Sequence, residues 1–122
     1  MYKDILEKAK HYEDISTRFL MDIVKIPSFS TKEKEVGECI LKEMQEIGMD
    51  EAYIDPLGNV IGRLGFGEKV IAFDAHIDTV YPGDLSLWDF DPFAAHLKDG
   101  KVWGRGTVDQ KSGMASMLTA AR

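Results

Sequence analysis

The sequence is poor in cysteine: Cys39 is the single one among 122 residues. One cysteine excludes an internal disulfide, and the position of Cys39 on the apolar stripe of an expected helix favours a buried, unreactive thiol. The chain also lacks an unbroken apolar run of the roughly 18 residues that a membrane span requires. The residues after Met1 are charged, whereas a secretory signal has an apolar core. We therefore expect a soluble, cytoplasmic protein with no membrane partner.

Clusters of basic residues are missing as well. Lys and Arg total 15 against 21 Asp and Glu, which gives a net charge of −6 at pH 7. An acidic balance repels phosphate backbones, so we do not expect nucleic acid as a partner. The chain is 44% apolar and 30% charged, a composition typical of a globular domain.

Apolar residues at helical spacing predict two helical regions in the first part of the chain. The first covers about residues 3–25, as one long helix or two short ones, and ends before Pro27. The second opens with Ser30 and Glu33 at capping-box spacing and closes at Gly48, where a left-handed residue is inexpensive. Its expected buried stripe consists of Val36, Cys39, Ile40, Met44 and Ile47.

Strand patterns follow. "EAYI" and "NVIGRL" are expected strands around the turn "DPLG", and "KVIAFDAHID" is expected beside the second of them, buried on both faces. Asp99 and Gly100 predict a hairpin turn, and "DQKSGMASMLTAAR" predicts a last helix. The order helix, helix, strands, helix predicts an α/β fold in which helices are layered on a mixed sheet.

His76 and Asp78 follow the most apolar of these strands. Their spacing of two places both side chains on one face, where Asp78 could hold the second ring nitrogen of a metal-binding His76. The alternative is an exposed histidine beside an aspartate that starts a turn. Asp74 receives no role.

Asp109 stands between the glycine-rich "GRGTVDQKSG" turn and the last helix. Aspartate is a short oxygen donor that can bridge two cations, but an ordinary helix N-cap is the alternative. Thr79 is expected to cap a turn, and Lys111 is expected to be exposed in the first turn of the last helix. Neither receives a catalytic role. His96 is expected to be half-buried in its hairpin. The expected core aromatic residues are Trp88, Phe90, Phe93 and Trp103.

Taken together, "AHIDTV", "WDFDPF" and "DGKVWGRGTVDQKSG" resemble the M20 family of metallopeptidases and amidohydrolases, which includes acetylornithine deacetylase and succinyl-diaminopimelate desuccinylase. "FLMDIVKIPSFS" and "DPLGNVIGRLG" extend the resemblance over the chain, which looks closest to the branch linked by name to selenium metabolism. The resemblance implies that residues 1–122 form the N-terminal part of a zinc-hydrolase catalytic domain. The remaining catalytic segment and a smaller dimerisation or lid domain would follow.

Carried over by this resemblance, His76 is a metal ligand, Asp78 its supporting catalytic carboxylate, and Asp109 the bridging ligand of a two-zinc site. Cobalt or manganese could occupy such a site in place of zinc. The peptide bond from Asp109 to Gln110 is expected to be cis, as it often is in this family.

The resemblance further implies a hydrolase that cleaves peptide or N-acyl amide bonds with metal-activated water, acts on small peptides or N-acyl amino acids, and is a homodimer at full length. The family's general base comes from a Glu-Glu pair, and this chain contains none. We therefore expect the chain alone to be inactive and to bind zinc weakly, because two ligands cannot close a four-coordinate site. The alternative is a non-catalytic α/β interaction module that retains the family signature.

Overall fold

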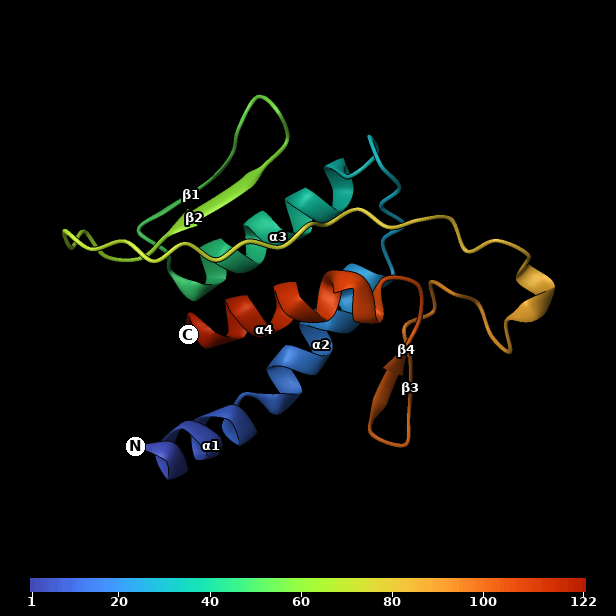
Figure 1. The fold of residues 1–122 in the computed structure, drawn as a ribbon, viewed down its shortest axis with the longest axis horizontal. Helices are drawn as coiled ribbons and strands as arrows, with labels where there is room; N and C mark the ends of the chain where they lie inside the picture. Colours follow the sequence, from blue (N-terminus) through green and yellow to red (C-terminus); the bar gives the residue numbers. More distant parts are fainter.

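The computed structural model describes residues 1–122 and contains four α-helices and two small antiparallel sheets (Figure 1). The helices are α1 (Tyr2–His11), α2 (Glu13–Val24), α3 (Lys34–Ile47) and α4 (Ser112–Ala120). The strands are β1 (Glu51–Ile54), β2 (Val60–Arg63), β3 (His96–Lys98) and β4 (Lys101–Trp103). The α/β class is confirmed, although the strands form two separate hairpins and not one mixed sheet.

Helices α2, α3 and α4 enclose the core, to which each contributes a fully buried aliphatic side chain: Ile23, Ile40 and Leu118. The first helical region is two helices that meet at Tyr12, and α1 buries none of its residues. Cys39 lies partly buried on α3 as a free thiol, and its burial raises the pKa of that thiol. None of the four helices combines the length and apolar character that crossing a bilayer requires.

Helix α3 begins at Lys34, later than the capping-box pattern predicted, with Glu33 as its N-cap residue. The Glu33 carboxylate accepts a hydrogen bond from the Thr31 backbone N–H at 2.7 Å, but Ser30 does not cap the helix. The Ser30 hydroxyl instead donates to Asp78 Oδ2 at 2.7 Å. A serine predicted to cap a helix therefore supports a residue 48 positions away.

Both predicted hairpin turns are confirmed. Between β1 and β2, Asp55 Oδ1 accepts hydrogen bonds from the backbone N–H groups of Leu57 and Asn59, each at 2.9 Å. Between β3 and β4, Asp99 and Gly100 have φ values of 53° and 70°, the left-handed pair that a tight two-residue hairpin requires.

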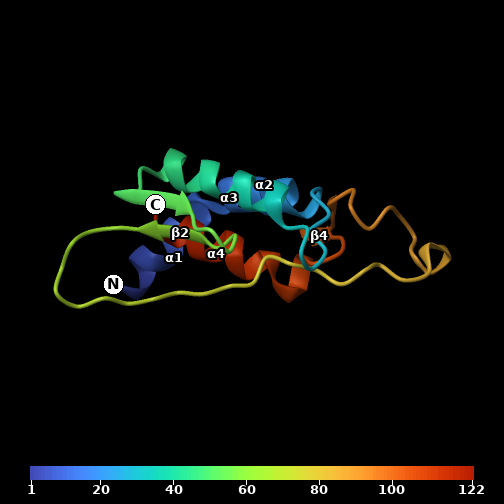
Figure 2. The same cartoon turned by 90° about the horizontal axis from the view of Figure 1, so that it is seen from above.

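The expected core strand at residues 69–78 is wrong. This segment forms no ladder: the strand pairs of the structure are β1 with β2 and β3 with β4. Val70, Ile71 and Phe73 are 80%, 81% and 76% exposed. Figures 1 and 2 show the segment running the length of the molecule outside both hairpins. Its apolar pattern would suit burial between strands, but the described residues provide no partner.

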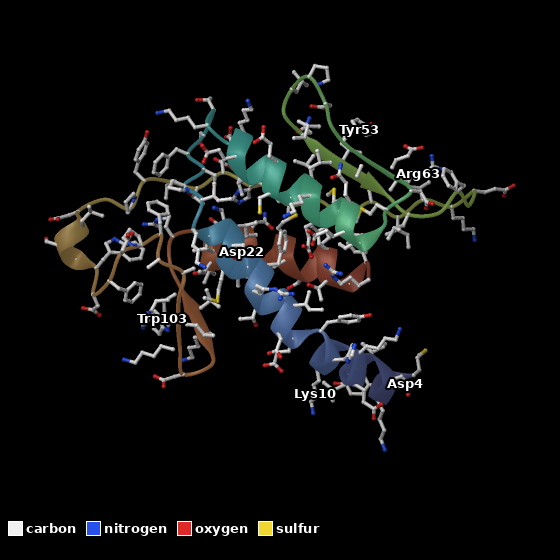
Figure 3. The ribbon with its side chains drawn as sticks, turned by 180° about the vertical axis from the view of Figure 1, so that it is seen from behind. Asp4, Lys10, Asp22, Tyr53, Arg63 and Trp103 are labelled. Carbon is white, nitrogen blue, oxygen red and sulfur yellow. The ribbon has the colours of Figure 1, made fainter.

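The aromatic residues near β3 and β4 also lie outside the core. Phe90 makes edge contacts with Trp88 and Trp103 and stacks on His96, with ring centroids 5.3 Å apart. Trp103 is 47% exposed, and His96 is exposed, not half-buried. Figure 3 shows Trp103 on its hairpin, away from the helical layer. These side chains form a peripheral cluster because their hairpin packs mainly against itself.

Candidate functional site

The structure brings together the three side chains that the sequence predicted. His76 Nε2 lies 2.9 Å from Asp109 Oδ1, although 33 positions separate the two residues. His76 Nδ1 lies 3.1 Å from Asp78 Oδ1 and 3.1 Å from the Asp78 backbone oxygen. All three residues line one cavity of about 280 Å³, together with Arg105. Their roles in metal binding stay a prediction, but their proximity is observed.

The turn that follows α2 holds the segment carrying His76 and Asp78. The buried Ser28 hydroxyl donates to the backbone oxygen of Ile77 at 2.8 Å, and the Thr79 N–H donates to the Ser28 backbone oxygen at 2.7 Å. Ser30 adds a hydrogen bond to Asp78, and Phe29 forms a β-bridge with Thr79, so three consecutive residues of this turn contact the segment. Nothing in the sequence pattern predicted these contacts, because they join residues nearly 50 positions apart.

Asp109 lies in the irregular turn Thr107–Lys111, which leads into α4. Its φ and ψ of −119° and 99° are not helical, and α4 has no side-chain cap, so the N-cap alternative is wrong. The peptide bond between Asp109 and Gln110 is cis, as expected. The Asp109 side chain is 85% exposed, which leaves its second carboxylate oxygen open to the cavity mouth.

Lys111 is buried, contrary to the expectation of an exposed helical residue. Its Nζ donates to the backbone oxygens of Ile23 and Ile26 at 2.7 and 2.8 Å, and burial lowers its pKa to about 8. Helix α2 has no basic residue in its last turn, so its terminal carbonyl groups need donors from elsewhere. That missing charge is the signal by which a distant buried lysine could have been anticipated.

The charges around His76 favour its protonated form. Asp109, through its hydrogen bond to Nε2, raises the pKa of His76, and the Asp78 backbone oxygen adds to this effect. The Ser30 hydroxyl, followed by the His76 charge, lowers the pKa of Asp78. A neutral imidazole has one N–H donor, whereas both ring nitrogens here face oxygen acceptors. Protonation supplies the second N–H donor and is therefore stabilising. A metal cation in place of that proton would meet the same demand.

The donor set fits a metal ion. An imidazole nitrogen and a carboxylate oxygen are both zinc donors, and a carboxylate on the other ring nitrogen is the usual support for a metal-binding histidine. Among residues 1–122, however, no group of three or more His, Cys, Asp or Glu side chains is arranged to hold a metal. This chain therefore offers a pair of donors and not a closed site.

The segment that holds these donors matches a known family. The model of "Peptidase family M20/M25/M40" matches residues 72–122, a range that includes His76, Asp78 and Asp109. The chain belongs to the M20 family. Its relatives extend this likeness over the rest of the chain. The M20 chain is 51% identical over 121 residues to YgeY of Escherichia coli (strain K12), covering 99% of this chain and 30% of that protein.

Two further relatives carry names that state an activity. A probable succinyl-diaminopimelate desuccinylase of Staphylococcus epidermidis is 37% identical over 111 residues, which cover 88% of this M20 chain and 27% of that protein. Succinyl-diaminopimelate desuccinylase 2 of Shewanella loihica is 34% identical over 105 residues, which cover 84% of this chain and 28% of that protein. These likenesses assign the chain to a family of hydrolases. It spans about 30% of the length of the curated relatives that it matches.

Proposed function

We propose that this chain supplies part of the catalytic domain of a metal-dependent hydrolase that cleaves peptide or N-acyl amide bonds with metal-activated water. The observation that supports this most is the 2.9 Å approach of His76 Nε2 to Asp109 Oδ1 inside a cavity. This exposed hydrogen bond joins two segments that lie 33 positions apart along the chain.

Each residue has a distinct role in the proposal. His76 would be a ligand of one metal ion, and Asp78, which lies 3.1 Å from Nδ1, would fix the orientation of the ring. Asp109 would be a shared ligand of that ion and a second one. The proposed ions are two zincs per complete site, and cobalt or manganese could occupy it. Bound there, the ions would polarise the substrate carbonyl and lower the pKa of bound water toward about 7.

The remaining chemistry belongs to the complete protein. A closed zinc site needs further ligands, and a general base must take the proton from the attacking water. We propose that both follow residue 122 and that the complete protein is a cytoplasmic homodimer acting on small peptides or N-acyl amino acids. The 122-residue chain alone is then inactive, because its donor pair binds metal weakly.

Calorimetric titration with zinc tests the donor pair. We expect weak binding by the wild-type chain, loss of that binding in His76→Ala and Asp109→Asn, and no change in His96→Ala. His96 is the matched control because it is an exposed histidine that stacks on Phe90 outside the cavity. Sub-micromolar zinc binding that survives His76→Ala would contradict the assigned ligands.

Hydrolysis by the complete protein tests the activity. A panel of N-acyl amino acids and dipeptides should be turned over by the metal-loaded protein, and a chelator should abolish the turnover. Turnover by the purified 122-residue chain would refute the claim that further residues are needed. Absence of turnover in the metal-loaded complete protein over the whole panel would favour the non-catalytic interaction module.

A further inference from the structure

We propose that Lys111 is a positioning residue of the candidate metal site. It ties the turn that carries Asp109 to the end of α2, which also holds the segment that carries His76. The inference rests on the proposed function in naming Asp109 and His76 as metal donors, and it goes beyond that function, in which Lys111 has no part. Both donors are then placed against one common anchor.

The Lys111 side chain is anchored at the end of α2, which Figure 1 shows beside the start of α4. Lys111 is 1% exposed, and its Nζ donates to the backbone oxygens of Ile23 and Ile26 at 2.7 and 2.8 Å. Helix α2 ends at Val24, between these two acceptors. The terminal carbonyl groups of a helix carry partial negative charge and lack partners within the helix, so they favour a buried ammonium. One nitrogen atom therefore holds both sides of the helix end.

The residues just after this helix end hold the segment of the other donor. The Ser28 hydroxyl donates to the backbone oxygen of Ile77 at 2.8 Å, and Ile77 is the residue next to His76. Pro27, whose ring fixes its own φ, is the single residue between Ile26 and Ser28. The end of α2 therefore contacts both donor-bearing segments through a short and stiff piece of chain.

The turn that carries Asp109 is closed around Lys111. The Lys111 backbone N–H donates to the Gly106 oxygen at 2.9 Å, so a hydrogen bond joins the two ends of the turn. A Cβ atom placed on Gly106 would lie 3.5 and 3.7 Å from Lys111 Cδ and Cε, so the aliphatic part of the lysine lies directly against the start of the turn. Asp109 stands between these two residues, and its backbone is therefore held by Lys111 from both ends of the turn.

The side chain of Asp109 does not fix the turn by itself. It is 85% exposed, and its hydrogen bond goes to His76, the residue that it would meet at a metal ion. Metal–ligand distances must agree to within about 0.2 Å, so a small displacement of the turn lowers the metal affinity of a chain that stays folded. Residues that orient metal ligands typically contribute about 10–100-fold to metal affinity, and we assign Lys111 a contribution of that order.

Amide hydrogen exchange followed by NMR tests the link of Lys111 to the turn, in the 122-residue chain and in buffer freed of metal ions by a chelating resin. In Lys111→Met, the protection of the amide at position 111 should fall about tenfold or more relative to the amides of α4, because two charge-assisted hydrogen bonds are lost. Ile40→Ala is the control: it weakens the buried core and should lower the protection at position 111 no more than that of α4. The control pattern in Lys111→Met would overturn the proposal.

Chemical modification separates the ammonium group from the aliphatic part of the side chain. In a Cys39→Ala background, the thiol of Lys111→Cys is alkylated in urea and the chain is refolded. An aminoethyl group restores an ammonium at nearly the length of lysine, and a propyl group has the same shape without the charge. Trimethylamine N-oxide in all samples keeps weakened variants folded. The aminoethyl form should regain the protection at position 111 and the propyl form should not, and equal protection in both forms would overturn the proposal.

The zinc affinity of the complete protein, measured by competition with a chelator, separates the positioning role from the proposed function. Lys111→Met should weaken zinc binding about tenfold or more and change the visible spectrum of the cobalt-loaded protein, whereas Ile40→Ala should leave both unchanged in the folded protein. Loss of protection at position 111 with unchanged zinc affinity and cobalt spectrum would overturn the positioning role. Zinc binding that survives both His76→Ala and Asp109→Asn would instead overturn the proposed function, while the exchange result would still support the link of Lys111 to the turn.

Discussion

Gly106 offers the sharpest test of how the two halves of the candidate site are held together. It lies in the turn before Asp109 with a φ of +83°, and a Cβ atom added there would come within 2.5 Å of Thr79 Cγ2. Gly48, at the end of α3, has the same φ of +83° and nothing within 4 Å of its Cβ position. A side chain at either glycine would therefore be strained by the positive φ, but only at Gly106 would it also clash with a neighbouring atom.

The expected costs follow from these two terms. A side chain in the left-handed region costs roughly 1–2 kcal/mol, which is the whole expected effect of Gly48→Ala. Gly106→Ala adds overpacking against a buried methyl group, typically about 1–3 kcal/mol, so we expect a total of about 2–5 kcal/mol. Thr79 cannot simply withdraw, because it is 5% exposed and its N–H is bound to Ser28.

Urea unfolding followed by circular dichroism measures these differences. Thr79→Ser removes the obstructing methyl group, so it should cost about 1 kcal/mol alone but stabilise the Gly106→Ala background by about 1 kcal/mol or more. Gly106→Ala should also weaken zinc binding, because its added methyl group pushes the turn that carries Asp109 away from the segment that carries His76. The reasoning fails if Gly106→Ala is no more destabilising than Gly48→Ala, or if Thr79→Ser brings no recovery.

Three further predictions concern the supporting structure. Ser28→Ala should lower the free energy of unfolding by about 1–3 kcal/mol, because the partly buried Ile77 carbonyl loses its donor, whereas Ser30→Ala, at an exposed position, should change it by no more than about 0.5 kcal/mol; urea unfolding checks both. Ile40→Ala should cost about 2–5 kcal/mol in thermal or urea unfolding, since Ile40 is fully buried, and a smaller loss would show that α3 is not part of the core. Hydrogen bonds from Asn59 lower the pKa of Asp55, so the stability that Asp55 contributes is present above its ordinary pKa of 3.8 and is lost as the pH falls through the lower folded value. Asn59→Ala should raise that pKa in carboxyl NMR titrations, and an unchanged value would contradict the assigned cause.

Local chemistry made several elements predictable. Gly48 ends α3 and Asp99–Gly100 turns the second hairpin because the left-handed conformation each requires is a property of the residue itself. The pairing of His76 with Asp78 was equally local, since a spacing of two in extended backbone puts both side chains on one face. These predictions need only neighbouring residues, and the two turns and the proximity of His76 and Asp78 are observed, whereas the equally local capping-box prediction at Ser30 was wrong.

Burial was predicted less well, because it depends on what else is present. The apolar run at residues 69–75 has the pattern of a core strand, yet Val70, Ile71 and Phe73 are exposed, and the run pairs with neither of the two sheets. Lys111 has the pattern of a surface residue, yet it is buried because α2 ends without donors for its own carbonyl groups. For Lys111 the deciding partners, Ile23 and Ile26, lie 88 and 85 positions away along the chain.

The amino-acid sequence by itself determined which residues can do chemistry and where the chain must turn: the donor types of His76, Asp78 and Asp109 are intrinsic to those residues. Only the tertiary structure decided that His76 and Asp109 meet at 2.9 Å, and that Lys111 reaches the end of α2. The physical reason is that a hydrogen bond or an ion pair depends on distance in space, and no local pattern encodes the distance between residues 33 positions apart.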